Sequence, residues 1–300
     1  KMENDARTAT DLDDYLRRNG IAGISGVDTR LLTLTIREKG TMRGMITGDM
    51  TSPLQPLLEQ IKAFEYISKV PVVSIKEKTI CRKGDLLLVD RNAGSPTESI
   101  TRRADGTGLR IALMDYGAKS NITRMLCLRG CEVVQYPWDT TAEEVFADGP
   151  DGIVLSNGPG DPKACGPAIR QMRKFYDSGI PVFGICLGHQ LMALGLGFDT
   201  YKLKYGHRGA NHSVKDLELN RCFVTSQNHS FCVDGDSIDP NVAVISHTNL
   251  NDRSIEGLKY LDRNVFTVQF HPEGAPGPMD TEFLFDRFID SIDTAARRGN

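Results

Sequence analysis

The sequence predicts an α/β protein built on a doubly wound, mostly parallel sheet, preceded by a truncated-looking N-terminal α/β segment. Strand-like and helix-like segments alternate from residue 109 onward, as successive βαβ units require. Two of the strand-like segments run directly into glycine-containing turns. Because ligands of open α/β sheets bind beyond the carboxyl ends of the strands, those two turns are the first place to look for a site.

The N-terminal part predicts two helices and a linker. Residues 11–19 and 29–39 are expected to be helical, with Gly20 and Gly40 as their C-terminal stops. The stretch at 90–108 is polar and rich in Gly, Ser and Thr, which is typical of a linker. The expected division is a remnant of an N-terminal domain at 1–89, a linker at 90–108, and the main domain at 109–298.

The main domain is expected to alternate strands and helices before it ends in further strands and one helix. The first strands are predicted at 109–114, 132–136, 152–155 and 181–185, with helices at 119–129 and 167–177. Later strands, partly antiparallel, are predicted at 221–225, 243–246, 255–260 and 265–269, and an amphipathic helix at 281–292.

The segment that ends in Gly-Ile-Cys-Leu-Gly predicts a cysteine nucleophile. An apolar strand stops at this point and a helical pattern begins at once, which is the layout of a nucleophile elbow. Gly184 and Gly188 flank the turn, where closely packed backbones leave no room for a Cβ. Cys186 then lies at a helix N-terminus, where the helix dipole favours the thiolate. An arbitrary cysteine between apolar residues is usually a small buried hydrophobe, and the two glycines are what favour the catalytic interpretation.

A second strand runs into His-Pro-Glu and supplies candidates for the base and its orienting acid. A cysteine nucleophile needs a base to take its proton, and the base needs a third group to fix its tautomer. His271 can be that base and Glu273 that third group. Alone, His271 is more typical of a histidine at a strand end, and Glu273 of a solvated acid. With Cys186 they predict a catalytic triad.

A third strand runs into Ser-Asn-Gly-Pro-Gly, and this loop presents backbone N–H groups without side chains in the way. The amides of Gly158 and of Leu187, the residue after the nucleophile, could form an oxyanion hole. Such preorganised donors are often worth about 3–4 kcal/mol each in a transition state. Glycine and proline also mark ordinary turns, so the loop is informative only through its place at a strand end.

These three motifs resemble the signatures of the class I (triad) glutamine amidotransferases. Within that superfamily, the chain resembles the family of small, glutamine-hydrolysing subunits of carbamoyl phosphate synthetase. The stretches that favour this family over the amidotransferases of guanylate or anthranilate synthesis lie at 26–30, 37–40, 116–122, 204–212, 225–231 and 276–280.

The resemblance implies hydrolysis of glutamine through a glutamyl thioester, and delivery of the ammonia to a large synthetase subunit that uses bicarbonate and ATP. The glutamine site is then expected to be lined by Gly158, Gly160, Leu187, Gln190, Asn228, Ser230 and Phe231. The chain lacks a phosphate-binding loop, so no cofactor is expected in it, and ATP and magnesium are assigned to the partner. The expected location is the cytoplasm, and the product could serve arginine or pyrimidine synthesis.

Two departures from the family pattern stand out. The family usually carries a further N-terminal portion of roughly a hundred residues, the size of a small domain, and this chain opens inside what resembles its tail. We therefore expect a fragment that lacks a pocket serine and part of the docking surface. The second departure is Ser230, where the family usually has glycine, so a side chain is added beside the bound glutamine.

Composition argues against several other classes of protein and kinds of site. A formal net charge of −3 argues against general binding of nucleic acid, and no apolar run is long enough to cross a membrane. The seven cysteines are odd in number and lack metal-site spacing, so no metal site and no disulfide framework are expected. The basic run formed by Lys204, His207, Arg208 and His212 is expected to be loop scaffolding or a subunit contact, as are His229 and His247.

Three alternatives stay open at this point. The chain could be the glutaminase of another amidotransferase, or a stand-alone γ-glutamyl hydrolase that uses the same triad. A non-catalytic docking module is the third alternative.

Overall fold

The computed structural model describes residues 11–64, 67–82 and 108–298, and the chain divides into two units at Tyr66/Ile67. The expected linker at 90–108 falls almost entirely outside the described residues. Strand β1 (Thr79–Cys81) lies within the expected N-terminal remnant, yet it pairs with the main sheet and belongs to the second unit. Among the described residues, no helix is long and apolar enough to span a membrane.

The described residues of the first unit form three helices, α1 (Leu12–Arg18), α2 (Thr29–Lys39) and α3 (Leu54–Ala63). The side chain of Asp11 caps α1 by accepting hydrogen bonds from two backbone amides, and Asp28 caps α2 by accepting one from Leu31. Gly40 ends α2 with a φ of 86°, a conformation that glycine adopts without strain. The helices predicted at 11–19 and 29–39 are confirmed, whereas α3 was not predicted.

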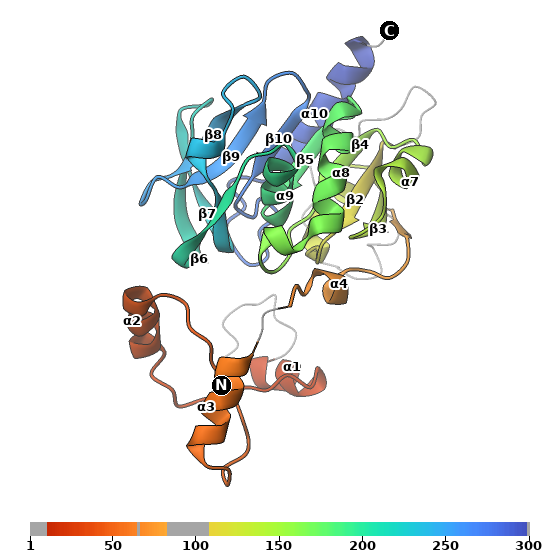
Figure 1. The fold of residues 1–300 in the computed structure, drawn as a ribbon. Helices are drawn as coiled ribbons and strands as arrows, with labels where there is room; N and C mark the ends of the chain where they lie inside the picture. The colour runs from red at the N-terminus through yellow and green to blue at the C-terminus, as the bar shows by residue number, and fades with distance from the viewer. Residues whose placement is uncertain (1–10, 65–66, 83–107, 299–300) are drawn as a thin grey trace. The chain divides into compact units, whose positions relative to one another are not determined.

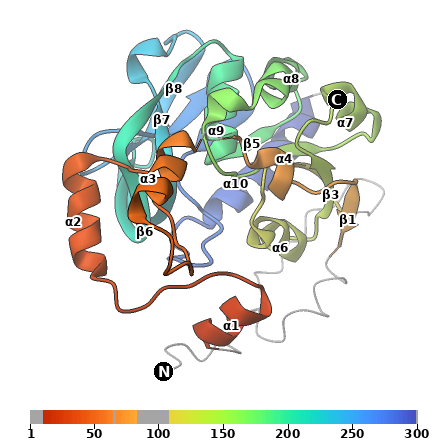
Figure 2. The ribbon, with the colours of Figure 1, turned by 60° about the horizontal axis from the view of Figure 1, so that its bottom comes forward.

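The second unit is built around one mixed sheet of the order β1-β3-β2-β4-β5-β10-β9-β8-β6-β7. Its further strands are β2 (Arg110–Asp115), β3 (Glu132–Pro137), β4 (Gly152–Leu155), β5 (Val182–Ile185), β6 (Thr200–Asp216), β7 (Arg221–Val233), β8 (Ala243–Asn249), β9 (Ile255–Tyr260) and β10 (Val265–Val268). The central run from β3 to β10 is parallel, and both flanks are antiparallel. The edge pairing of β1 with β3 is visible in Figure 2.

Helices cover both faces of this sheet. They are α4 (Val70–Val73), α6 (Ser120–Leu128), α7 (Ala142–Ala147), α8 (Gly166–Asp177), α9 (Leu187–Gly195) and α10 (Phe283–Arg298), and two short 3-10 turns, η1 (Pro162–Ala164) and η2 (Gly235–Ser237), complete the unit. Alternate residues of β2 explain the two layers: Ala112 and Met114 pack with α7, α8 and α9, while Ile111 and Leu113 pack with α6 and α10. Figure 1 shows α8 and α9 together on one side of the sheet. The prediction of a doubly wound α/β sheet is confirmed; the centre of the sheet is parallel, and the sheet as a whole is mixed.

The prediction of a loop around the basic run at 204–212 is wrong, because β6 passes through it. The strand alternates apolar and polar residues only from Tyr201 to Tyr205; the stretch that follows is polar and contains Gly206 and Gly209, both at positive φ, which hides the strand pattern there. Its pairing with β7 is interrupted by register shifts beside both glycines. Strand β7 is likewise longer than predicted and continues past Thr225 to Val233.

Candidate active site

The candidate site lies where three neighbouring parallel strands end at the same edge of the sheet. Strand β5 pairs with β4 on one side and with β10 on the other, with Leu155 opposite Gly184 and Val268 opposite Ile185. The loop that contains Gly158 follows β4, Cys186 follows β5, and His271 follows β10. The sheet topology therefore brings together three motifs that are 113 residues apart at their extremes, from position 158 to position 271.

The turn around Cys186 has the geometry of a nucleophile elbow. Cys186 has φ 52° and ψ −102°, a backbone conformation that costs a non-glycine residue roughly 1–3 kcal/mol, and it occupies the N-cap of α9. A Cβ added at Gly188 would lie 2.3 Å from the backbone oxygen of Leu155. One added at Gly184 would lie 2.6 Å from Cγ2 of Thr267. The glycine pair is therefore needed for close packing, as the sequence predicts.

Glu273 holds the His271 ring. Glu273 is held in turn by Lys119, the residue before α6, and by Asn121 in α6. Nδ1 of His271 lies 2.7 Å from Oε1 of Glu273, and both side chains are buried. Lys119 Nζ lies 3.2 Å from the same oxygen, and the Asn121 side-chain amide donates to the Glu273 backbone carbonyl. Sequence reasoning missed Lys119 and Asn121, because only the packing of α6 brings them to this carboxylate.

The second ring nitrogen of His271 is left open for the nucleophile. Nε2 is buried and has no hydrogen-bond partner among the described residues, and Cys186 interacts electrostatically with the ring. Burial lowers the pKa of His271, but the interactions with Cys186 and then with Glu273 outweigh it and raise that pKa to about 9. Burial raises the pKa of Glu273, and His271 and Lys119 together bring it below its usual value.

Replacing Cys186 by alanine is expected to lower the pKa of His271. The substitution removes the largest contribution that raises this pKa and leaves the burial that lowers it. In the parent, the ring loses its proton as the pH rises through about 9; in Cys186→Ala the midpoint moves to lower pH. NMR titration of ¹⁵N-labelled histidine measures both midpoints. An unchanged midpoint would show that sulfur and ring do not interact.

Two backbone amides lie beside the elbow. A Cβ added at Gly158 would lie 2.6 Å from Cδ2 of Leu187 and 2.3 Å from the backbone oxygen of Tyr116, so the loop after β4 packs directly against the first residue of α9. Within the described part of the chain, neither the N–H of Gly158 nor that of Leu187 donates a hydrogen bond. Two unengaged donors next to a nucleophile are suited to hold an oxyanion.

Gln269 is a site residue that sequence reasoning did not identify. Its Nε2 lies 3.6 Å from Cys186 Sγ, and its Oε1 accepts a 2.9 Å hydrogen bond from Gln190 Nε2. Gln190 Nε2 also donates to the backbone oxygen of Phe231 at 2.7 Å. A chain of contacts thus joins the nucleophile to β7. The only signal in the sequence was the position of Gln269 two residues before His271.

The other expected pocket residues are less directly connected to Cys186. Asn228 is exposed and Ser230 is half-buried on β7, and Gly160 has a φ of 100° in the loop after β4. For Gly160 and Asn228, the described contacts give no direct link to Cys186. Ser230 accepts a hydrogen bond from Arg208 Nη2 at 2.5 Å and has no positive φ, so serine fits this backbone without strain.

His189, one position before Gln190, is a structural residue in this fold. It is fully buried, its Nδ1 lies 2.8 Å from Oγ1 of Thr267, and burial lowers its pKa to about 3. A ring that stays neutral at all ordinary pH values fits a structural role.

The chain belongs to the class I glutamine amidotransferases, whose family model matches residues 112–291. Residues 1–46 match the model of the carbamoyl-phosphate synthase small chain, CPSase domain. Within the class, the chain is a member of the carbamoyl phosphate synthase small-chain family. It is 42% identical over 307 residues to the small chain of Polynucleobacter asymbioticus, covering 100% of this chain and 77% of that protein.

Two further comparisons agree. The small chain of Salmonella typhimurium is 43% identical over 290 residues, which cover 96% of this chain and 74% of that protein. Among solved structures, a putative GMP synthase subunit from Thermoplasma acidophilum superposes with a TM-score of 0.54 at 24% identity, over 63% of this chain and 95% of that one. The likeness to that structure concerns the fold alone.

Proposed function

We propose that this chain is the glutamine-hydrolysing subunit of a carbamoyl phosphate synthetase, and that Cys186, His271 and Glu273 are its catalytic triad. The observation that carries the proposal is the meeting of three strand ends, where the nucleophile, the buried His271–Glu273 pair and two free amides lie together. Membership of the small-chain family supports the choice of glutamine as the substrate.

In the proposed acylation step, the Cys186 thiolate attacks the side-chain amide carbon of glutamine. The carbonyl electrons move onto oxygen, and the amides of Gly158 and Leu187 hold the resulting oxyanion. As the oxyanion collapses, the C–N bond breaks and His271 donates its proton to the departing nitrogen. The products of this step are ammonia and a γ-glutamyl thioester on Cys186.

In the proposed deacylation step, His271, now neutral, takes a proton from water, and the resulting hydroxide attacks the thioester carbon. The C–S bond breaks, which releases glutamate and restores the thiolate–imidazolium pair. Glu273, fixed by Lys119, keeps Nδ1 of the ring protonated throughout.

Substrate is proposed to enter from the side of β7 and the loop after β4. Cys186 keeps only 3% of its surface exposed, whereas Gly158, Asn228 and Ser230 remain accessible. The pocket wall is proposed to consist of Gly158, Gly160, Leu187, Gln190, Asn228, Ser230 and Phe231.

The ammonia is proposed to pass to a large synthetase subunit, which binds ATP and magnesium and combines ammonia with bicarbonate. No cofactor of the reaction is then needed in this chain. The cytoplasm is the proposed compartment, because none of the seven cysteines, all of which lie within the described residues, forms a disulfide, and a reducing environment keeps them so.

The proposal is tested with a chloroketone analogue of glutamine and with the large subunit. We expect the analogue to alkylate Cys186, as mapped by peptide mass spectrometry, and glutamine to protect against it. We also expect glutamate release to increase when the large subunit, bicarbonate and ATP are added. Glutamate release that does not increase when the large subunit is added would favour a stand-alone γ-glutamyl hydrolase. Failure of Cys186 to react with the analogue would favour a docking module.

A further inference from the structure

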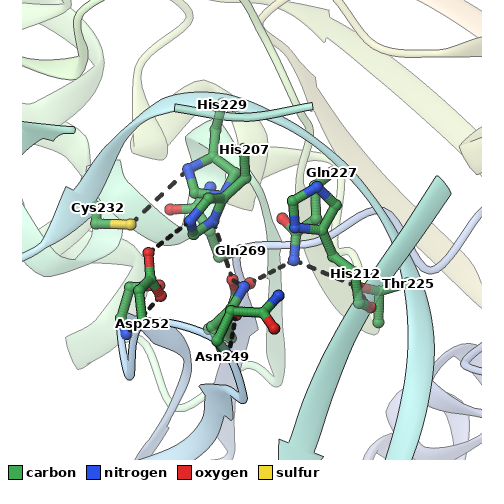
Figure 3. Close-up of polar contacts among 12 residues, drawn as sticks. His207, His212, Thr225, Gln227, His229, Cys232, Asn249, Asp252 and Gln269 are labelled. Carbon is green, nitrogen blue, oxygen red and sulfur yellow. Dashed lines mark hydrogen bonds and ion pairs between the residues drawn. The ribbon is translucent and has the colours of Figure 1, made fainter. Parts of the chain in front are cut away.

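A cluster of potential metal ligands lies behind the candidate glutamine pocket. His207 on β6, His229 on β7 and Glu256 on β9 each offer one ligand atom, and these three atoms all lie within 4.8 Å of one another. Figure 3 shows the two histidine rings next to each other at the centre of a network of polar side chains. All three side chains are buried, and Glu256 has no exposed surface.

Two of the distances within the cluster match those expected around a tetrahedral zinc ion. Nδ1 of His207 lies 3.2 Å from Nε2 of His229 and 3.5 Å from Oε1 of Glu256. Bonds of about 2.0–2.2 Å from zinc to nitrogen and oxygen, arranged tetrahedrally, separate neighbouring ligand atoms by roughly 3.3–3.5 Å. Two imidazoles with a single carboxylate also favour zinc over magnesium or calcium, which prefer sets of oxygen ligands.

The outer contacts of both histidines orient them as metal ligands. Nδ1 of His229 lies 2.8 Å from the backbone oxygen of Phe231, and Nε2 of His207 lies 2.8 Å from Oδ2 of Asp252. A carbonyl or carboxylate oxygen can only accept, so the hydrogen of each neutral ring belongs on that outer nitrogen. The inner nitrogens then present lone pairs to the same point in space. Metal-binding histidines are typically held by oxygen acceptors in this way.

The carboxylate of Glu256 is fixed but lacks a permanent cation. Asn249 Nδ2 donates to its Oε1 at 2.9 Å, and Gln227 Nε2 donates to its Oε2 at 2.8 Å. Among the described residues, neither lysine nor arginine forms an ion pair with it. A buried carboxylate is costly unless a positive charge compensates it. The adjacent Oε1 of Gln227 is also buried and lacks a hydrogen-bond partner in the described part of the chain.

We propose that His207 Nδ1, His229 Nε2 and the Glu256 carboxylate bind one divalent transition-metal ion of the zinc type, with a water molecule completing the tetrahedron. The ion joins three strands, and its ligands are 22 and 27 residues apart in sequence, which is why no short ligand motif along the chain reveals the site. It also fixes His229, whose ring contacts the carbonyl of Phe231, the same carbonyl that accepts from Gln190. The role is structural, and the ion stiffens β7 behind the glutamine pocket.

The test measures metal binding by the full chain after chelator treatment, in a Cys186→Ala background so that the reactive thiolate does not compete. We expect one equivalent of zinc by equilibrium dialysis, the visible absorption bands of tetrahedral Co²⁺, and a higher Tm with zinc than without. His207→Gln and Glu256→Gln should each weaken zinc binding more than about 100-fold, beyond the effect expected for an outer contact.

Two further variants keep the test decisive. His247→Gln is the matched control, because His247 is also a buried histidine beside a carboxylate, with its Nε2 3.4 Å from Asp216 Oδ2, and lies outside the cluster. It should bind zinc like the parent. Asp252→Asn alters a half-exposed residue and should fold even if the ligand variants do not; we expect zinc binding about 10–100-fold weaker.

Two results would overturn the proposal. One is the absence of stoichiometric zinc binding, in which case a proton shared among the three side chains is the occupant. The other is equal zinc affinity in the ligand variants and the His247→Gln control, because the ion would then bind elsewhere.

Discussion

Replacing Cys186 by alanine or serine is expected to abolish hydrolysis of glutamine while the protein stays folded. Alanine supplies no nucleophile, and a serine hydroxyl is not ionised by a histidine at this position as a thiol is. Loss of a nucleophile in a triad costs more than about 10⁴-fold in turnover. Release of glutamate from glutamine measures the effect, and circular dichroism with thermal unfolding measures the fold.

The fold should survive because the substitution removes one small buried atom at a turn whose shape is set by Gly184 and Gly188. A loss of roughly 1–2 kcal/mol is the usual scale of such a change. Cys165→Ala is a matched control, since Cys165 is also free and fully buried but lies in the core beside α8. That variant should keep the parent rate. If Cys186→Ala kept most of its activity, the assignment of the nucleophile would be wrong.

His271→Asn is expected to lower turnover more than Glu273→Gln. Asparagine cannot accept or donate the proton that both steps require, and knocking out the base of a triad costs on the order of 10⁵–10⁶-fold. Glutamine at 273 keeps an oxygen that can accept from Nδ1 at the present 2.7 Å but loses the charge that stabilises the imidazolium. Changes of this kind cost roughly 10²–10⁴-fold.

Rates with saturating glutamine, measured for both variants and the parent, decide the order. Both variants must show cooperative thermal unfolding, because Glu273 is fully buried and also pairs with Lys119. Equal losses, or a larger loss in Glu273→Gln, would mean that the two roles are misassigned.

The central α/β part was predictable because the sequence patterns of its strands and helices match their burial in the folded protein. The strand predicted at 152–155 matches β4 residue for residue, and the helix predicted at 167–177 differs from α8 by one residue. Buried parallel strands are short apolar runs, and such runs are readable from sequence. Helix α7 was missed although Thr141 and Glu144 form a complete capping box at its start.

The antiparallel end of the sheet was harder to predict. Strand β6 is held by its pairing with β7 and β8, and past Tyr205 its polar, glycine-containing middle carries no pattern that distinguishes a strand from a loop. The residues of the candidate site likewise fall into those that were predicted and those that were missed. Cys186 and His271 were found because their motifs are local, whereas Gln269 and Lys119 reach the site only through strand register and helix packing.

Cys186 and His271, the proposed nucleophile and base, follow two strands that are hydrogen-bonded neighbours, with Val268 opposite Ile185 and the Cys186 amide donating to the Val268 carbonyl at 2.8 Å. The 4.7–4.9 Å repeat between adjacent strands therefore sets how far apart the two strand ends lie. A slip of one residue along either strand would turn its side chains to the opposite face of the sheet. The pairing of β5 with β10 thus both stabilises the sheet and positions the two proposed catalytic residues.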